Sequence, residues 1–200
     1  MKHSSYVRCS GVCMAFAFVL GGAIRAEVLE VPSEYPTLGF ALGAASAGDT
    51  ISVAGGRYLE HDLVIPVPVA IIGRPSSGQG EVIIDADHQG RVLSVLGLSG
   101  TTTIQFIKFI NSGGWPQYGG TVLCRGSVLE LRDCVFADNW NGFGGALACH
   151  EGAEVTVDRC LFADNGAIAG GAIACESGTN LHVSESVFHD NAASWYGGSI

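Results

Sequence analysis

Short runs of β-prone apolar residues alternate with glycine-rich turns through the second half of the chain. Val128–Leu131, Val155–Val157 and Leu181–Val183 are too short for packed helical pairs and are typical of strands. A hexapeptide recurs between these runs at one fixed interval. Its copies are Cys134-Val-Phe-Ala-Asp-Asn139, Cys160-Leu-Phe-Ala-Asp-Asn165 and Ser186-Val-Phe-His-Asp-Asn191.

A glycine pair follows the same period. It occurs in Gly144-Gly-Ala-Leu-Ala-Cys149 and Gly170-Gly-Ala-Ile-Ala-Cys175, with further copies at Gly119-Gly-Thr-Val122 and Gly197-Gly-Ser-Ile200. The period of about 26 residues lies in the range, about 20 to 50 residues, that is typical of solenoids and propellers. Each copy holds about three short strands, so it predicts one coil of an all-β parallel β-helix whose coils stack about 4.8 Å apart.

Stacking of such coils places equivalent residues in columns. We expect the phenylalanines to fill the lumen and the asparagines to form an amide ladder that satisfies backbone groups at a bend. The paired glycines allow either a positive φ or a close approach of two backbones. The two structural columns are Phe136, Phe162 and Phe188, and Asn139, Asn165 and Asn191.

The cysteines also follow the repeat. A buried free thiol suits a tight inward position. A disulfide between neighbouring coils is the alternative, because about 4.8 Å between Cα atoms lies inside the bridging range. One column is Cys124, Cys149 and Cys175, and the other is Cys134 and Cys160, continued by Ser186.

Residues 1–26 have the features of an export signal. Lys2, His3 and Arg8 precede an apolar run, Gly11–Ile24, that is too short to span about 30 Å of hydrocarbon as a helix. Cleavage after Ala23 or after Ala26 would release an exported protein, and no later stretch is long and apolar enough for a transmembrane helix. We therefore expect an extracellular, cell-surface or periplasmic location.

Residues 27–200 are expected to form one β-helix domain of six to seven coils. Leu38, Leu42 and Ala45 lie on one face of a short predicted helix, which either caps the open end of the lumen or lies on the surface. The sequence stops at Ile200 inside a glycine-pair motif, which would leave an open sheet edge. We therefore expect the domain to be truncated at its C-terminus.

Charge narrows the range of partners. The formal net charge is -9, and outside residues 1–26 the chain carries 7 basic and 19 acidic residues, or -12. Such a surface repels phosphate backbones and anionic lipid headgroups. Nucleic-acid binding is therefore not expected, whereas a neutral polysaccharide remains compatible with this charge.

The alternating GGA-[ILV] and FxxN tetrapeptides resemble the polymorphic outer membrane protein repeat of β-helical surface proteins. The resemblance covers about residues 104–200 and implies a right-handed parallel β-helix of the pectate-lyase-like superfamily. The short helix followed by a strand near the N-terminus resembles the capped opening of many exported β-helix proteins. The matching tetrapeptides are Gly144-Gly-Ala-Leu147, Gly170-Gly-Ala-Ile173, Phe136-Ala-Asp-Asn139, Phe162-Ala-Asp-Asn165 and Phe188-His-Asp-Asn191.

Candidate chemistry is sparse. Asp85 and Asp87 are a possible carboxylate pair for a lyase or hydrolase, although such a pair at a strand end is also typical of a turn. The histidines share no zinc-ligand spacing. The repeat stacks Asp138, Asp164 and Asp190, which are either solvated turn residues or carboxylates bridged by a hard cation such as Ca²⁺. No other cofactor is indicated.

Aromatic residues gather in the turns between the asparagines and the glycine pairs. Because these turns stack along one edge, exposed rings there would suit the faces of sugars; the alternative is that they cover neighbouring turns. The favoured function is non-catalytic adhesion or binding of a glycan or cell-surface partner, and the alternative is a polysaccharide-acting enzyme, by analogy of fold. The six aromatic residues are Trp115, Tyr118, Trp140, Phe143, Trp195 and Tyr196.

Overall fold

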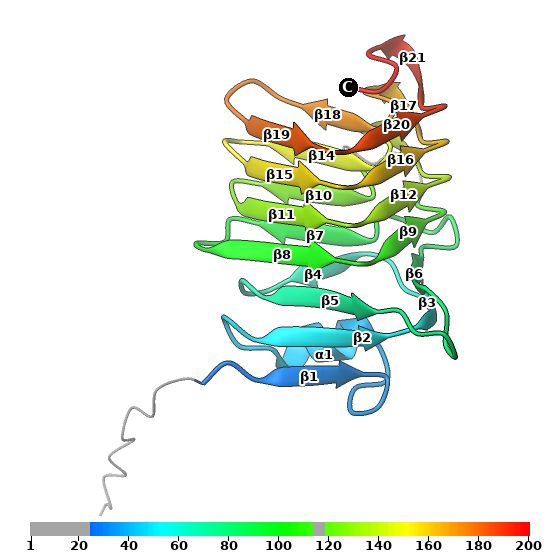
Figure 1. Ribbon diagram of the computed structural model, residues 1–200. Helices are drawn as coiled ribbons and strands as arrows, with labels where there is room; N and C mark the ends of the chain where they lie inside the picture. The colour runs from blue at the N-terminus through cyan, green and yellow to red at the C-terminus, as the bar shows by residue number, and fades with distance from the viewer. Residues whose placement is uncertain (1–24, 114–118) are drawn as a thin grey trace, which may run out of the picture.

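The computed structural model describes residues 25–113 and 119–200, which coil as a right-handed parallel β-helix of about six turns (Figure 1). The predicted fold class is therefore confirmed. The predicted export signal lies almost wholly outside the described residues. Within residues 25–113 and 119–200, no helix has the length and apolar character needed to cross a bilayer.

Four parallel sheets form the walls of the solenoid. We number them in the order in which one coil passes through them. Sheet 1 contains β1 (Val28–Val31), β2 (Thr50–Ala54), β5 (Ala70–Arg74), β8 (Thr101–Gln105), β11 (Val128–Arg132), β15 (Glu154–Asp158) and β19 (Asn180–Ser184). Sheet 2 contains β3 (Gly56–Leu59), β6 (Val82–Asp85), β9 (Lys108–Ile110), β12 (Val135–Ala137), β16 (Leu161–Ala163) and β20 (Val187–His189).

The remaining two sheets follow sheet 2 along the coil, and all three strands of sheet 3 lie in the second half of the chain. Sheet 3 contains β13 (Trp140–Phe143), β17 (Gly166–Ala169) and β21 (Ala192–Tyr196). Sheet 4 contains β4 (Leu63–Ile65), β7 (Leu93–Leu96), β10 (Val122–Arg125), β14 (Leu147–His150) and β18 (Ile173–Cys175). A later coil therefore runs from β11 through β12 and β13 to β14, and then enters β15 one level higher (Figure 1).

The coil length is regular only in the second half. Glu130 pairs with Thr156 and Thr156 with His182, so both of these coils have the repeat length of about 26 residues. In the first half, Ala70 pairs with Thr50 in the coil below and with Thr103 in the coil above. The first of these two coils is shorter than the later repeat and the second is longer. The strands keep their places in the sheets while the connections between them change length.

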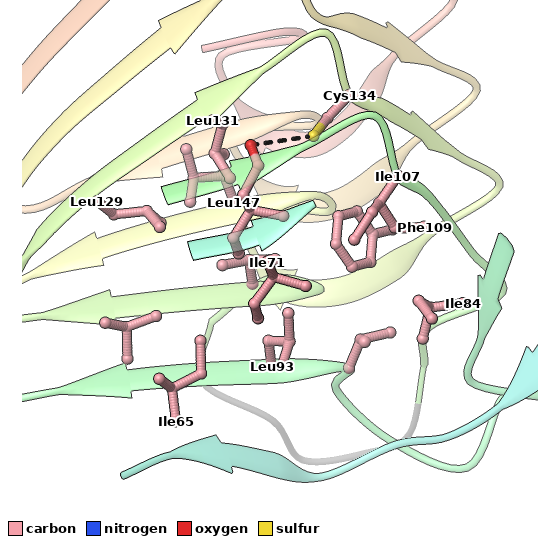
Figure 2. Close-up of a cluster of buried hydrophobic side chains, with 14 of the residues drawn as sticks. Ile65, Ile71, Ile84, Leu93, Ile107, Phe109, Leu129, Leu131, Cys134 and Leu147 are labelled. Atoms are coloured by element: carbon pink, nitrogen blue, oxygen red, sulfur yellow. Dashed lines mark hydrogen bonds between the residues drawn. The ribbon is translucent and has the colours of Figure 1, made fainter. Parts of the chain in front are cut away.

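Apolar side chains from three walls meet in the lumen. Figure 2 shows Ile71 and Leu129 from sheet 1, Phe109 from sheet 2, and Leu93 and Leu147 from sheet 4 directed toward one another. All five are fully buried. Because successive strand residues face opposite sides of a sheet, the alternating apolar positions of these short strands supply one continuous core.

Helix α1 (Leu38–Ala44) packs against β1, β2 and β4 at the N-terminal end of the solenoid (Figure 1). Thr37 is its N-cap, and Leu38, Ala41 and Leu42 are buried. Ala45 follows the helix and is partly buried against the same core. The capping role predicted for this segment is therefore confirmed, with the helix ending one residue before Ala45.

Glu60 holds the N-terminus of this helix. Its two carboxylate oxygens accept hydrogen bonds from the backbone N–H groups of Leu38 and Gly39, each at 2.7 Å. Both groups lack partners within the helix, because the first turn of any helix leaves its N–H groups free. Glu60 itself is buried.

Replacing Glu60 by alanine is expected to lower the free energy of unfolding by about 1–2 kcal/mol, as loss of a helix cap does elsewhere. Glu60→Gln keeps one amide oxygen as an acceptor and is expected to lose less. Urea denaturation followed by circular dichroism measures both losses. Equal stability of Glu60→Ala and the wild type would contradict the capping role.

The two glycines of each pair have different structural roles. The first has a left-handed backbone, with φ of 61° at Gly144 and 63° at Gly170. The second allows close approach of coils, since a Cβ on Gly145 would lie 2.3 Å from the carbonyl oxygen of Gly171. The glycine pair thus combines a turn with a backbone contact, the two alternatives that the sequence leaves open.

Candidate functional site

The phenylalanine column lies in the lumen and serves packing. The rings of Phe136 and Phe162 stack with centroids 5.0 Å apart, and those of Phe162 and Phe188 with centroids 4.8 Å apart. Phe109 extends the stack downward, 5.0 Å from Phe136. Phe109, Phe136 and Phe162 are fully buried. These three rings have no surface to offer a ligand.

The asparagine column forms a continuous hydrogen-bonded ladder. Asn139 donates its side-chain amide to Oδ1 of Asn165, and Asn165 donates to Oδ1 of Asn191, both at 2.9 Å. Asn165 also donates to the carbonyl oxygen of Phe136 at 3.0 Å. The ladder therefore ties the bends of successive coils to one another, which is a structural role.

The second cysteine column also satisfies backbone groups. The thiols of Cys134 and Cys160 donate to the carbonyl oxygens two residues earlier, and the Ser186 hydroxyl does the same. The residues between donor and acceptor, such as Asp133 and Arg159, have left-handed φ values near 50°. A small side chain with one hydrogen-bond donor suits this turn, so either cysteine or serine can occupy the position.

The aspartate column lies on the surface. Asp138, Asp164 and Asp190 are all exposed, and their φ values of 57°, 54° and 50° place each in a left-handed turn. Aspartate tolerates this conformation better than most residues. In the described parts of the chain, no three His, Cys, Asp or Glu side chains gather in a way that would hold a metal ion.

Asp85 is buried and engaged in structure. Its Oδ1 accepts hydrogen bonds from the backbone N–H of Asp87 at 2.8 Å and from the side chain of Asn111 at 3.1 Å, and its Oδ2 contacts Arg57. Burial raises the pKa of Asp85, but these partners outweigh it and lower the pKa overall. Asp87 is exposed. The structure thus separates the two carboxylates that the sequence suggests as a pair.

Trp140 is the most informative residue of the aromatic edge. Its side chain is 60% exposed although it lies in an interior coil. The next coil has Gly166 in register with it, and a Cβ on Gly166 would lie 2.2 Å from the Trp140 ring. The Trp140 ring therefore covers the glycine with one part and remains open to solvent elsewhere.

A groove of about 460 Å³ is lined by residues of sheets 3 and 4, and Trp140 is not one of them. Phe143 and Tyr196 line it, and they occupy the same column as Ala169. Tyr196 and the adjacent Trp195 are strongly exposed. Trp115 and Tyr118, the other two residues of the predicted aromatic edge, lie outside the described residues.

Polar residues that the sequence analysis did not single out line the same groove. His150 and Glu176 are bonded through Nδ1 and Oε1 at 2.8 Å. Arg125, in register with His150, pairs with Glu151 beside a second hollow of about 240 Å³. The sequence holds one sign that these polar residues belong together. Each of them directly follows a cysteine of the first column: Arg125, His150 and Glu176.

The groove brings together the rings of Phe143 and Tyr196, the His150 and Glu176 side chains and the Cys175 thiol. It combines flat rings, which favour apolar ring faces, with a few hydrogen-bonding side chains at the rim. Comparisons of the chain with protein-family models, with curated proteins and with solved structures give no match in any of the three.

Proposed function

We propose that this chain is an exported, non-catalytic β-helix that binds a neutral glycan along the aromatic edge formed by Trp140, Phe143, Trp195 and Tyr196. The observation that carries the proposal is the exposure of Trp140, at 60%, in β13, which is the edge strand of sheet 3 and pairs with β17. Contiguous exposed apolar surface on a soluble protein marks sites of interaction.

The fold does not require an aromatic residue at this position. Trp140 is in register with Gly166 and Ala192, and Phe143 with Ala169. The coil closes with small residues as well as with rings. Because the rings are dispensable for coil geometry, their presence supports a role outside the molecule.

Geometry and charge support a glycan rather than a nucleic acid or an anionic surface. Phe143 and Tyr196 stand in one column two coils apart, so a strand spacing of about 4.8 Å separates them by about 10 Å, close to the length of two sugar units. The acidic surface, with 19 acidic and 10 basic residues over the whole chain, repels polyanions. The resemblance to repeats of β-helical surface proteins further supports an exposed binding protein.

A panel of neutral oligosaccharides tests this proposal. We expect at least one to bind with a saturable change in tryptophan fluorescence, and Trp140→Ala to weaken that binding about tenfold, equivalent to about 1.4 kcal/mol. Phe40→Ala is the matched control, because Phe40 is an equally exposed ring, at 67%, on the distant cap helix. Calorimetric titration measures each variant.

Trp140→Ala should keep the thermal unfolding midpoint of the wild type, since its exposed ring mainly covers Gly166. Absence of binding across the panel would contradict the proposal. So would equal losses of affinity in Trp140→Ala and Phe40→Ala.

A further inference from the structure

The five cysteines within the described residues differ in what their sulfurs contact. Cys124 donates to the carbonyl oxygen of Ser127, while Cys134 and Cys160 donate to carbonyl oxygens of their own turns. Cys149 and Cys175 interact with each other, and Cys175 also interacts with Thr179. The pair is thus a sulfur–sulfur neighbour pair, as Cys134 and Cys160 also are.

Backbone geometry places the same two residues in bonding range. Cys149 in β14 and Cys175 in β18 are register partners in a parallel pair, so their Cα atoms are about 4.8 Å apart, within the range that disulfides span. Closing the bond requires the Cβ atoms to approach slightly. Cys175 is the last residue of β18 and a turn follows, so this end of the strand has room to adjust.

The two thiols also differ in access. Cys149 is fully buried in an interior strand, whereas Cys175 lies in β18, the edge strand of sheet 4, where it is exposed and lines the 460 Å³ groove. The interaction with Cys149 is the largest cause that lowers the pKa of Cys175, to about 7, and burial opposes it. The thiolate is the form that attacks disulfides.

We propose that Cys149 and Cys175 form an oxidation site that reacts with small disulfides, such as glutathione disulfide, to give a covalent link between neighbouring coils. The Cys175 thiolate attacks one sulfur of the small disulfide, forming a mixed disulfide and releasing one thiolate. The Cys149 thiol then loses its proton and attacks Cys175 Sγ, releasing the second thiolate. Two protein thiols are oxidised, and one small disulfide is reduced to two thiols.

The same chemistry does not extend to the other neighbouring pair. Cys134 and Cys160 also contact each other, but they are 1% and 2% exposed, so an external disulfide has no path to either sulfur. Their thiols further serve as donors to turn carbonyls, and a disulfide would remove both donors. The site is independent of the glycan-binding proposal, since it needs no ligand on the aromatic edge.

Mass-spectrometric peptide mapping after incubation with glutathione disulfide tests the site. In the wild-type chain we expect a Cys149–Cys175 link as the main product. Cys149→Ser should stop at glutathione attached to Cys175, and Cys175→Ser should form neither product, with thiol consumption at least tenfold slower. Cys160→Ser is the control, because serine already occupies that column at Ser186, and it should react as the wild type does.

Two results would overturn the proposal. One is a wild-type protein that accumulates glutathione on Cys175 while Cys149 remains a free thiol. The other is a link between Cys134 and Cys160, or between Cys124 and Cys149, that forms before the proposed one. The identity of the linked cysteines in the wild-type protein tests the proposal without any variant. A variant that fails to fold therefore does not affect the conclusion.

Discussion

Replacing Phe136 by alanine is expected to lower the free energy of unfolding by about 3–5 kcal/mol. The ring is fully buried and stacks on Phe109 and Phe162, with both centroids 5.0 Å away. Its removal leaves a cavity that rigid strands on either side cannot fill. Urea denaturation, with the transition midpoint and slope both fitted, measures the loss.

The control for Phe136 is Phe40→Ala. Phe40 is 67% exposed on the cap helix, so its loss is expected to change stability by less than about 0.5 kcal/mol. Similar effects of the two variants would contradict the assignment of Phe136 to the lumen.

Replacing Asn165 by alanine is expected to cost about 1–3 kcal/mol, because it leaves buried polar groups without partners. The side chain accepts from Asn139 and donates to Asn191 and to the carbonyl oxygen of Phe136, and it is 1% exposed. Thermal and urea unfolding both report the change. Asn165→Asp retains the acceptors but loses the donor and buries a charge, so we expect a loss at least as large at neutral pH.

Asp164→Ala is the neighbouring control. Asp164 is exposed and adjacent to Asn165 in the chain. We expect less than about 0.5 kcal/mol of change, with and without added Ca²⁺. If Asp164→Ala destabilised the protein more than Asn165→Ala, the assignment of Asn165 to the interior and Asp164 to the surface would be wrong. A loss of stability seen only with added Ca²⁺ would instead indicate a cation site in the aspartate column.

The second half of the fold was predictable from spacing because its period is strict. Phe136, Phe162 and Phe188 recur at one fixed interval in the sequence and stack in space. Strand pairing in the first half cannot be predicted from a repeat. Ala70 pairs with strands at unequal sequence distances, so these coils have no common period. There the strand pairing follows from packing of apolar faces, which short local patterns do not encode.

The candidate site was predictable only in outline. The aromatic turns were visible in the sequence, but the Trp140 ring can lie where it does only because Gly166, in the next coil, has no Cβ. His150 and Glu176 seemed unrelated until strand register placed them across the same groove. The sequence offers Asp85 as one of a carboxylate pair or as part of a turn, and only the pairing of β6 with β9 brings Asn111 to it.

The phenylalanine and asparagine columns stabilise the solenoid, whereas the aromatic edge is the surface proposed to bind a glycan. Titration of the ¹⁵N-labelled protein with an oligosaccharide from the panel tests this division most directly. We predict a saturable shift of the Trp140 indole N–H resonance, while the backbone amides of the fully buried Phe136 and Phe162 keep their positions. Shifts of those buried amides with an unchanged Trp140 indole, at saturating oligosaccharide, would contradict it.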